Sequence, residues 1–120
     1  MRTTPAATIG AALLLSACGG GGSALPPAED GVLRVVALDK QDFDADMYTT
    51  EAGEVSIEYV LDGFESHTLT IEGLEDQLHL EVGKASAATA TINLEPGRYM
   101  LYCDIAGHRA SGMEARLLVS

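Results

Sequence analysis

Apolar and polar residues alternate in short runs along most of this chain. Within residues 54–60, for example, Val55, Ile57 and Tyr59 alternate with polar residues. The same two-residue period occurs in residues 67–72, 77–82, 89–94, 99–103 and 115–119, and residues 32–38 are rich in β-branched side chains. Glycine, proline and aspartate separate these runs, and no long helical period occurs. The pattern predicts an all-β fold, a Greek-key antiparallel β-sandwich of about seven or eight strands. We place this folded unit at residues 31–120, a length that buries one core.

One tyrosine indicates a Greek-key corner. Tyr99 follows the pair Pro96–Gly97 at the start of a late strand. In such a corner the tyrosine hydroxyl bonds to backbone a few residues upstream and fixes the loop. The alternative is a core tyrosine in an ordinary tight turn.

The N-terminal residues predict export. Arg2 gives a basic start, residues 9–15 are apolar, and the stretch is too short for a stable membrane-spanning helix. Its ending, Leu15 to Cys18, resembles a bacterial lipobox, in which small residues precede a cysteine that is lipidated. We therefore interpret residues 1–17 as a lipoprotein signal peptide and Cys18 as the lipidation site. The alternative is an ordinary signal peptide with an incidental cysteine.

The predicted mature protein is tethered and does not span a membrane. Residues 18–30 are rich in glycine and serine and contain Pro26–Pro27, so they form a linker that is flexible and then stiffer. Lipidation at such a cysteine supplies the multiple acyl chains that stable anchoring needs. We expect the protein on the outer face of the cytoplasmic membrane or in the periplasm.

The charge of the chain limits its partners. It has 18 acidic and 7 basic residues, and loss of Arg2 with the signal leaves a net charge of −12. Such a surface repels nucleic acid and has no polybasic segment that would attract anionic lipid. We therefore expect the lipid anchor alone to hold the protein at the membrane. A protein partner with a basic docking face would be attracted at low salt.

Four side chains form a candidate metal site. Cys103, His108 and Met113 follow each other at five-residue intervals, and His67 begins an earlier predicted strand. Two imidazoles, a thiolate and a weak axial thioether are the ligands of a blue-copper electron-transfer site. Cys103 is the thiol left for the folded domain, because lipidation would consume Cys18 and disfavours a disulfide between the two. His79 falls on the polar side of its run, so we expect it to be exposed and exclude it.

With these residues in view, the chain resembles the cupredoxins, among them the single-domain plastocyanin, azurin and auracyanin-like electron carriers. The resemblance covers about residues 32–120, and the four-residue gaps on either side of His108 are most similar to the auracyanin and rusticyanin pattern. It implies one type 1 copper per chain, with His67, Cys103 and His108 as equatorial ligands and Met113 as the axial ligand. It also implies a carrier that passes single electrons through His108 to redox partners such as a cytochrome, reductase, oxidase or reaction centre. We expect this carrier to be a monomer. The His108 ring edge would emerge through a small apolar patch, with Phe64 a candidate neighbour.

The chain departs from the family at one position. The residue after the first histidine is commonly asparagine in these proteins, and here it is Thr68. Thr68 keeps the backbone N–H that points at the cysteine sulfur, and its hydroxyl offers a shorter tie between the two ligand loops. Asp104, next to the thiolate, carries a carboxylate that can cap the ligand loop. We expect these groups to orient the ligands and tune the metal.

Two other functions compete with that of an electron carrier. A copper chaperone or storage module on the same fold would have extra Met or His clusters, whereas Met47 and Met100 are scattered. A copper enzyme would need a second metal site, and only His79 is left to supply it. The sequence therefore favours a carrier over an enzyme, with the chaperone or store as the alternative.

Overall fold

The computed structural model of the chain describes residues 25–120. The predicted signal peptide (1–17) and the predicted lipidation site Cys18 lie outside these residues. Within them, no helix has the length and apolar character needed to cross a membrane.

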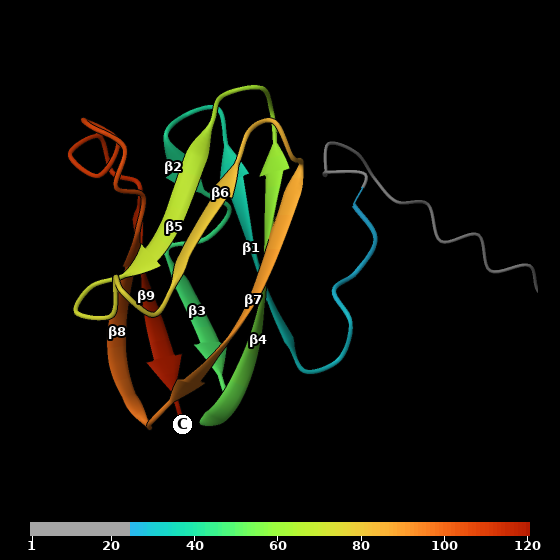
Figure 1. Cartoon of the computed structure of the whole chain (residues 1–120), viewed down its shortest axis with the longest axis vertical. Helices are drawn as coiled ribbons and strands as arrows, with labels where there is room; N and C mark the ends of the chain where they lie inside the picture. Colours follow the sequence, from blue (N-terminus) through green and yellow to red (C-terminus); the bar gives the residue numbers. More distant parts are fainter. Residues whose placement is uncertain (1–24) are drawn as a thin grey trace, which may run out of the picture.

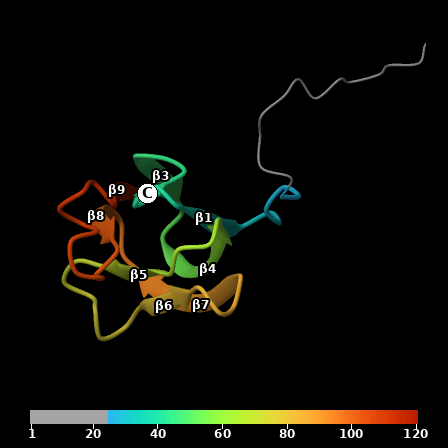
Figure 2. The same ribbon diagram turned by 90° about the horizontal axis from the view of Figure 1, so that it is seen from above.

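In the described part of the chain, nine strands form two sheets that pack against each other (Figures 1 and 2). They are β1 (Val32–Leu38), β2 (Asp42–Phe43), β3 (Met47–Thr50), β4 (Gly53–Asp62), β5 (His67–Ile71), β6 (His79–Val82), β7 (Ala87–Leu94), β8 (Gly97–Tyr102) and β9 (Glu114–Val119). One sheet has the order β2-β1-β4-β7 and the other has the order β3-β9-β8-β5-β6. The predicted β-sandwich is therefore confirmed.

The core lies between the sheets and follows the alternation in the sequence. Val55, Ile57 and Tyr59 of β4 are all buried, and Leu69 and Leu101 of the other sheet are fully buried in the same cluster. Burial of each such side chain contributes about 1.5–3 kcal/mol. The buried Tyr59 hydroxyl donates a hydrogen bond of 2.9 Å to the carbonyl oxygen of Thr68, which joins the two sheets at the start of β5.

The direction of two strand pairs differs from the prediction. β1 pairs with β4 in parallel, and β3 pairs with β9 in parallel, so both sheets are mixed and not antiparallel throughout. A two-residue period reports which side of a strand is buried but carries no information about the direction of its neighbour. The alternation does not mark β2 and β3, because β2 has two residues and β3 is a short strand at the edge of its sheet.

The tyrosine corner is present. The Tyr99 hydroxyl donates a hydrogen bond of 2.8 Å to the carbonyl oxygen of Glu95, four residues upstream. This bond holds the turn from β7 into β8, the strand that leads to Cys103. The predicted bond from this hydroxyl to upstream backbone is confirmed.

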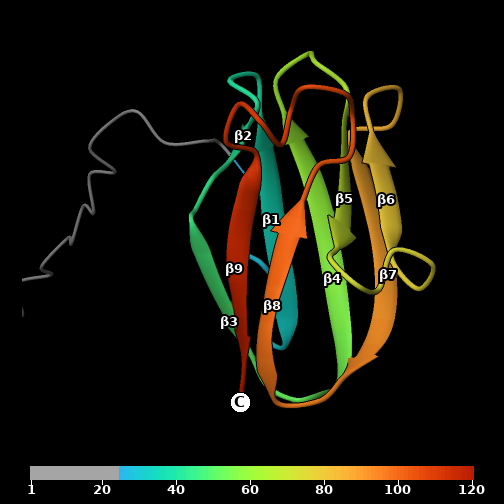
Figure 3. The ribbon, with the colours of Figure 1, turned by 90° about the vertical axis from the view of Figure 1, so that its left-hand side faces the viewer.

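Four connections meet at one end of the sandwich, the upper end in Figure 3. They are residues 39–41 between β1 and β2, 63–66 before β5, 83–86 before β7, and 103–113 between β8 and β9. Because β5 starts at this end and β8 finishes there, the topology brings His67 and Cys103 together although 36 positions separate them in the sequence.

Candidate metal centre

Three predicted ligands converge at this end of the sandwich. The Nδ1 atoms of His67 and His108 lie 3.2 Å apart, and Cys103 Sγ lies 3.5 Å from His108 Nδ1. The ligand atoms of these three residues all lie within 4.8 Å of one another, and all three side chains are buried. Met113, the predicted axial ligand, is fully buried at the base of the same loop.

The loop that carries His108 closes on the strand ends through backbone hydrogen bonds. The amide of Met113 donates to the carbonyl oxygen of His108 at 3.1 Å, and the amide of Cys103 donates to that of Met113 at 3.2 Å. The amide of His108 donates to the carbonyl oxygen of Ile105 at 3.0 Å. These bonds fix the spacing of Cys103, His108 and Met113, so the five-residue intervals correspond to one closed loop.

The donor atoms fit a copper ion chemically. A thiolate and two imidazole nitrogens in a buried pocket, with a thioether close in the chain, are the donors of a type 1 copper site. Burial, as the largest influence, lowers the pKa of His67 and so favours its neutral form, which has a lone pair to offer a metal. His67 Nδ1 lies 3.2 Å from His108 Nδ1, so it is the ring nitrogen that faces the other candidate ligands.

Thr68 ties the two ligand segments together, as expected from its position. Its backbone amide donates to Cys103 Sγ at 3.3 Å. Its hydroxyl donates to Asp104 Oδ1 at 2.5 Å and accepts a bond of 2.9 Å from the Asp104 amide. The hydroxyl also lies 3.4 Å from Cys103 Sγ, but it has a single hydrogen, and the short carboxylate contact takes it. Thus the backbone amide of Thr68 bonds to the Cys103 sulfur, and its side chain bonds to Asp104 in the loop that carries His108.

Asp104 extends this network to the surface. Its carboxylate accepts from the Thr68 hydroxyl and lies 2.9 Å from His79 Nε2, and the Thr68 bond is the main cause of its lowered pKa. His79 is exposed, as predicted from its phase, and it contacts Asp104 and not the ligand cluster.

A brace beside His108 was not predicted from the sequence. Arg109 donates to Glu72 at 2.9 Å and to Glu114 at 3.0 Å, and its guanidinium lies 4.1 Å from the centre of the Tyr102 ring. The residue after a ligand is thereby fixed to both β5 and β9 ends, which restrains the loop.

Sequence reasoning also missed three residues on the outer side of the ligands. Glu65 Oε1 lies 3.2 Å from His108 Nε2, Asp39 accepts hydrogen bonds from the backbone of the segment that carries Glu65, and Gln41 contacts the Glu65 carboxylate. Asp39 and Glu65 also form a possible ligand group with His67. This group shares its histidine with the first cluster, and Asp39 already accepts two amide bonds, so we assign both carboxylates to support of the site. No spacing rule in the sequence marks these residues.

Phe64 stands out on the same segment. Its side chain is 97% exposed, the highest value among the exposed large hydrophobic residues of the described chain. It therefore contributes nothing to the core and lies open to solvent beside the Glu65–His108 contact.

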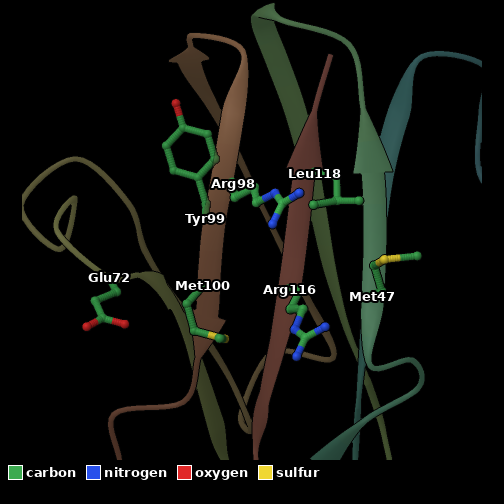
Figure 4. Close-up of a pocket in the computed structure, with 7 residues that line it drawn as sticks. All are labelled: Met47, Glu72, Arg98, Tyr99, Met100, Arg116 and Leu118. Carbon is green, nitrogen blue, oxygen red and sulfur yellow. The ribbon is translucent and has the colours of Figure 1, made fainter.

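A broad hollow elsewhere on the surface is not a metal site. It lies on the outer face of β3, β9 and β8 and is lined by Met47, Glu72, Arg98, Tyr99, Met100, Arg116 and Leu118 (Figure 4). It contains no histidine or cysteine. Among the described residues, the side chains that could bind a metal thus lie at the end of the sandwich where the four connections meet.

Comparison with known proteins supports the assignment of the fold. Residues 76–120 match the sulfocyanin (SoxE) domain family. No curated protein sequence matches the chain. The structure of reduced auracyanin from the photosynthetic bacterium Roseiflexus castenholzii is similar, with a TM-score of 0.65, 14% identity, and coverage of 78% of this chain and 99% of that one.

Two further solved structures agree. Auracyanin A, a "blue" copper protein of the green thermophilic photosynthetic bacterium Chloroflexus aurantiacus, has a TM-score of 0.61 and 15% identity, and the match covers 74% of this chain and 98% of that one. Auracyanin B has a TM-score of 0.59 and 16% identity, with coverage of 84% and 96%. At these identities the likeness establishes the fold, which is that of the cupredoxins.

Proposed function

The chain has the cupredoxin fold, and from this premise we propose that it binds one type 1 copper ion and carries single electrons between exported redox partners. The observation that carries the proposal is the convergence of His67, Cys103 and His108 within 4.8 Å in a buried pocket. His67, Cys103 and His108 would be equatorial ligands, and Met113 would be the weak axial ligand. Copper supplies the one-electron Cu(II)/Cu(I) couple.

The residues of this chain would make the transfer fast by moving little. Cys103 and His67 are 0% exposed and lie at the ends of paired strands. The Thr68–Asp104 hydrogen bonds and Arg109 restrain the loop of residues 103–113, which carries His108. A rigid set of ligands whose geometry suits both oxidation states needs little rearrangement when an electron arrives or leaves. His108, 7% exposed, is the ligand whose ring reaches the surface.

The surface around His108 suggests the chemistry of the partner. Phe64, the chain neighbour of Glu65, is exposed, and Asp39 and Glu65 add negative charge. An apolar socket surrounded by basic side chains on a redox protein would complement this face. The net charge of −12 after loss of Arg2 would attract such a partner over longer distances.

The N-terminal residues would set the location of the protein. Residues 1–17 would direct export, lipid on Cys18 would anchor the protein, and residues 18–30 would link it to a monomeric domain at 31–120. The anchor would hold the protein on the outer face of the cytoplasmic membrane or in the periplasm, and the lipid would be its only membrane contact.

The domain would work as a carrier and not as an enzyme. A catalytic copper protein needs a second metal site, and the remaining histidine of the described chain, His79, is exposed and held by Asp104. A copper chaperone or store on this fold is the alternative. Its cargo must exchange readily, whereas here the cysteine and one histidine are fully buried.

Absorption and electron-paramagnetic-resonance spectra of the protein with one equivalent of Cu(II) test the proposal. We expect an intense blue thiolate-to-copper band and a narrow copper hyperfine splitting, both lost in Cys103→Ser. His79→Gln is the matched control and should keep the blue colour. A faint spectrum with ordinary broad splitting would reject the carrier, and weak, exchangeable Cu(I) binding would then favour the chaperone or store.

A further inference from the structure

We propose that Glu65 is a positioning residue for the metal centre, held against the outer edge of His108 by Asp39 and Gln41, and that it lowers the reduction potential. This inference rests on the proposed function. It assigns a role to three residues outside the ligand set.

The contact itself joins the outer nitrogen of a ligand to a carboxylate. His108 Nε2 lies 3.2 Å from Glu65 Oε1, and the two side chains are 9% and 35% exposed. His108 Nδ1, the other ring nitrogen, faces His67 Nδ1 and Cys103 Sγ. A carboxylate at the outer nitrogen favours the form of the ring with its proton there, which leaves the Nδ1 lone pair for the metal.

The segment that carries Glu65 is clamped from the β1–β2 connection. Asp39 Oδ1 accepts hydrogen bonds from the amides of Phe64 at 2.7 Å and Glu65 at 2.9 Å. Gly63 makes this approach possible, since a Cβ at that position would lie 2.1 Å from Asp39 Oδ1. The backbone of residues 63–65 is therefore fixed beside the site before any partner arrives.

Gln41 fixes the side chain of Glu65 in turn. Its Nε2 donates to Glu65 Oε1 at 3.3 Å, which is the oxygen that meets His108. Gln41 has a φ of 56°, and it is the non-glycine residue with positive φ among the described residues. A residue held in this sparsely populated region often belongs to a functional site.

The sign of the effect follows from charge. The oxidised site carries one more positive charge than the reduced site, so a nearby carboxylate stabilises the oxidised form more. His67 has carboxylate oxygens of Asp39 and Glu65 within 4.8 Å of a ring nitrogen, whereas Glu65 Oε1 lies only 3.2 Å from His108 Nε2. Of the two imidazoles, His108 is therefore the one in close contact with the Glu65 carboxylate.

Reduction potentials of the copper-loaded full chain test the inference. In Glu65→Gln we expect a higher potential, with a ratio of reduced to oxidised protein at fixed applied potential that rises on the order of tenfold. Glu54→Gln removes the same charge at the other end of β4 and should leave the potential nearly unchanged. Gln41→Asn keeps a residue that tolerates positive φ but is too short to reach Glu65, so we expect a smaller rise.

A second measurement detects positioning apart from potential. In the Cu(I) protein, nuclear magnetic resonance of the His108 ring should show an Nε2 proton that exchanges slowly with solvent in the wild type. The exchange should be faster in Glu65→Gln and unchanged in Glu54→Gln.

The outcomes separate this inference from the proposed function. If the wild type shows no blue copper site, the proposed function fails and this inference fails with it. If the wild type is blue but Glu65→Gln leaves the potential and the proton exchange unchanged, the inference alone is overturned. An equal rise in potential in Glu65→Gln and Glu54→Gln would also overturn it, because only the net charge would then matter.

Discussion

The hydroxyl of Thr68 donates to Asp104 Oδ1 at 2.5 Å, and the amide of Asp104 returns a bond of 2.9 Å to the same hydroxyl. This reciprocal pair joins the start of β5 to the residue after Cys103. A threonine thereby makes the tie expected of the longer asparagine side chain, because the Asp104 carboxylate reaches toward it. The backbone amide of Thr68 remains free to donate to Cys103 Sγ.

Thr68→Val should weaken the fold without removing the metal site. Valine has a similar shape, but it leaves the Asp104 amide and carboxylate without the hydroxyl partner, which costs about 1–3 kcal/mol. Chemical denaturation of the metal-free protein measures this loss. Copper should still bind with its blue colour, since the amide bond to the sulfur comes from the backbone. Thr91→Val, on the exposed side of β7, is the control, and an equal loss there would contradict the assigned role.

Gly63→Ala should disturb the clamp on the Glu65 segment. Gly63 has a φ of 150°, and a Cβ there would meet Asp39 Oδ1 at 2.1 Å. We expect a loss of about 1–3 kcal/mol in the free energy of unfolding, read from denaturation curves. Gly73→Ala is the matched control, since Gly73 also has positive φ but no atom within 4 Å of its Cβ position. If both variants lost the same amount, the clash with Asp39 would not be the cause.

The strand phases and the proximity of the candidate ligands His67, Cys103 and His108 could be predicted from the sequence. The alternation in β4, β6 and β9 identified the buried positions because one face of each strand packs in the core. It failed in β5, where all five residues are buried. There Thr68 and Thr70 bond to Asp104 and to the Leu78 carbonyl oxygen, so polar residues are buried with partners.

The support of the site could not be predicted. Asp39, Gln41 and Glu65 come from two loops, and loop residues have no periodicity that would place them beside His108. Their contacts depend on the parallel pairing of β1 and β4, which brings the C-terminal ends of both strands to the same end of the sheet. Because the alternation does not encode strand direction, the contacts of these three residues around His108 could not be predicted.

Asp39 should make stability depend on acid pH. Two backbone amide bonds, from Glu65 and then Phe64, hold its pKa below the ordinary value of 3.8. A lowered pKa in the folded state adds stability that is fully present above the unfolded value and is lost as pH falls through the folded value. In metal-free protein, the stability difference between wild type and Asp39→Asn should therefore be constant near neutral pH and shrink below about pH 4. Urea denaturation from pH 7 to pH 3 checks this, and a difference that grew in acid would contradict it.

Phe64→Ala should slow reaction with a protein partner and leave the fold unchanged. The side chain is 97% exposed, so the free energy of unfolding should change by less than about 0.5 kcal/mol. An exposed aromatic at a docking face carries binding energy, so the second-order rate of reduction by a basic cytochrome c should fall about five- to thirty-fold. Stopped-flow mixing measures that rate. Reaction with ferricyanide, a small reagent that needs no docking face, is the control and should stay within about twofold.

Met113 allows a test with two variants of opposite sign. Its side chain is fully buried, and its amide and carbonyl bond to His108 and Cys103, so the backbone keeps its place when the side chain changes. Met113→Leu conserves volume and should cost less than about 1.5 kcal/mol in stability. It removes an axial donor, which destabilises Cu(II) relative to Cu(I) and should raise the reduction potential. Met113→Gln offers a harder oxygen donor and should lower it. Both proteins should remain blue, because the colour arises at Cys103, and voltammetry that gave shifts of the same sign would exclude Met113 as the axial ligand.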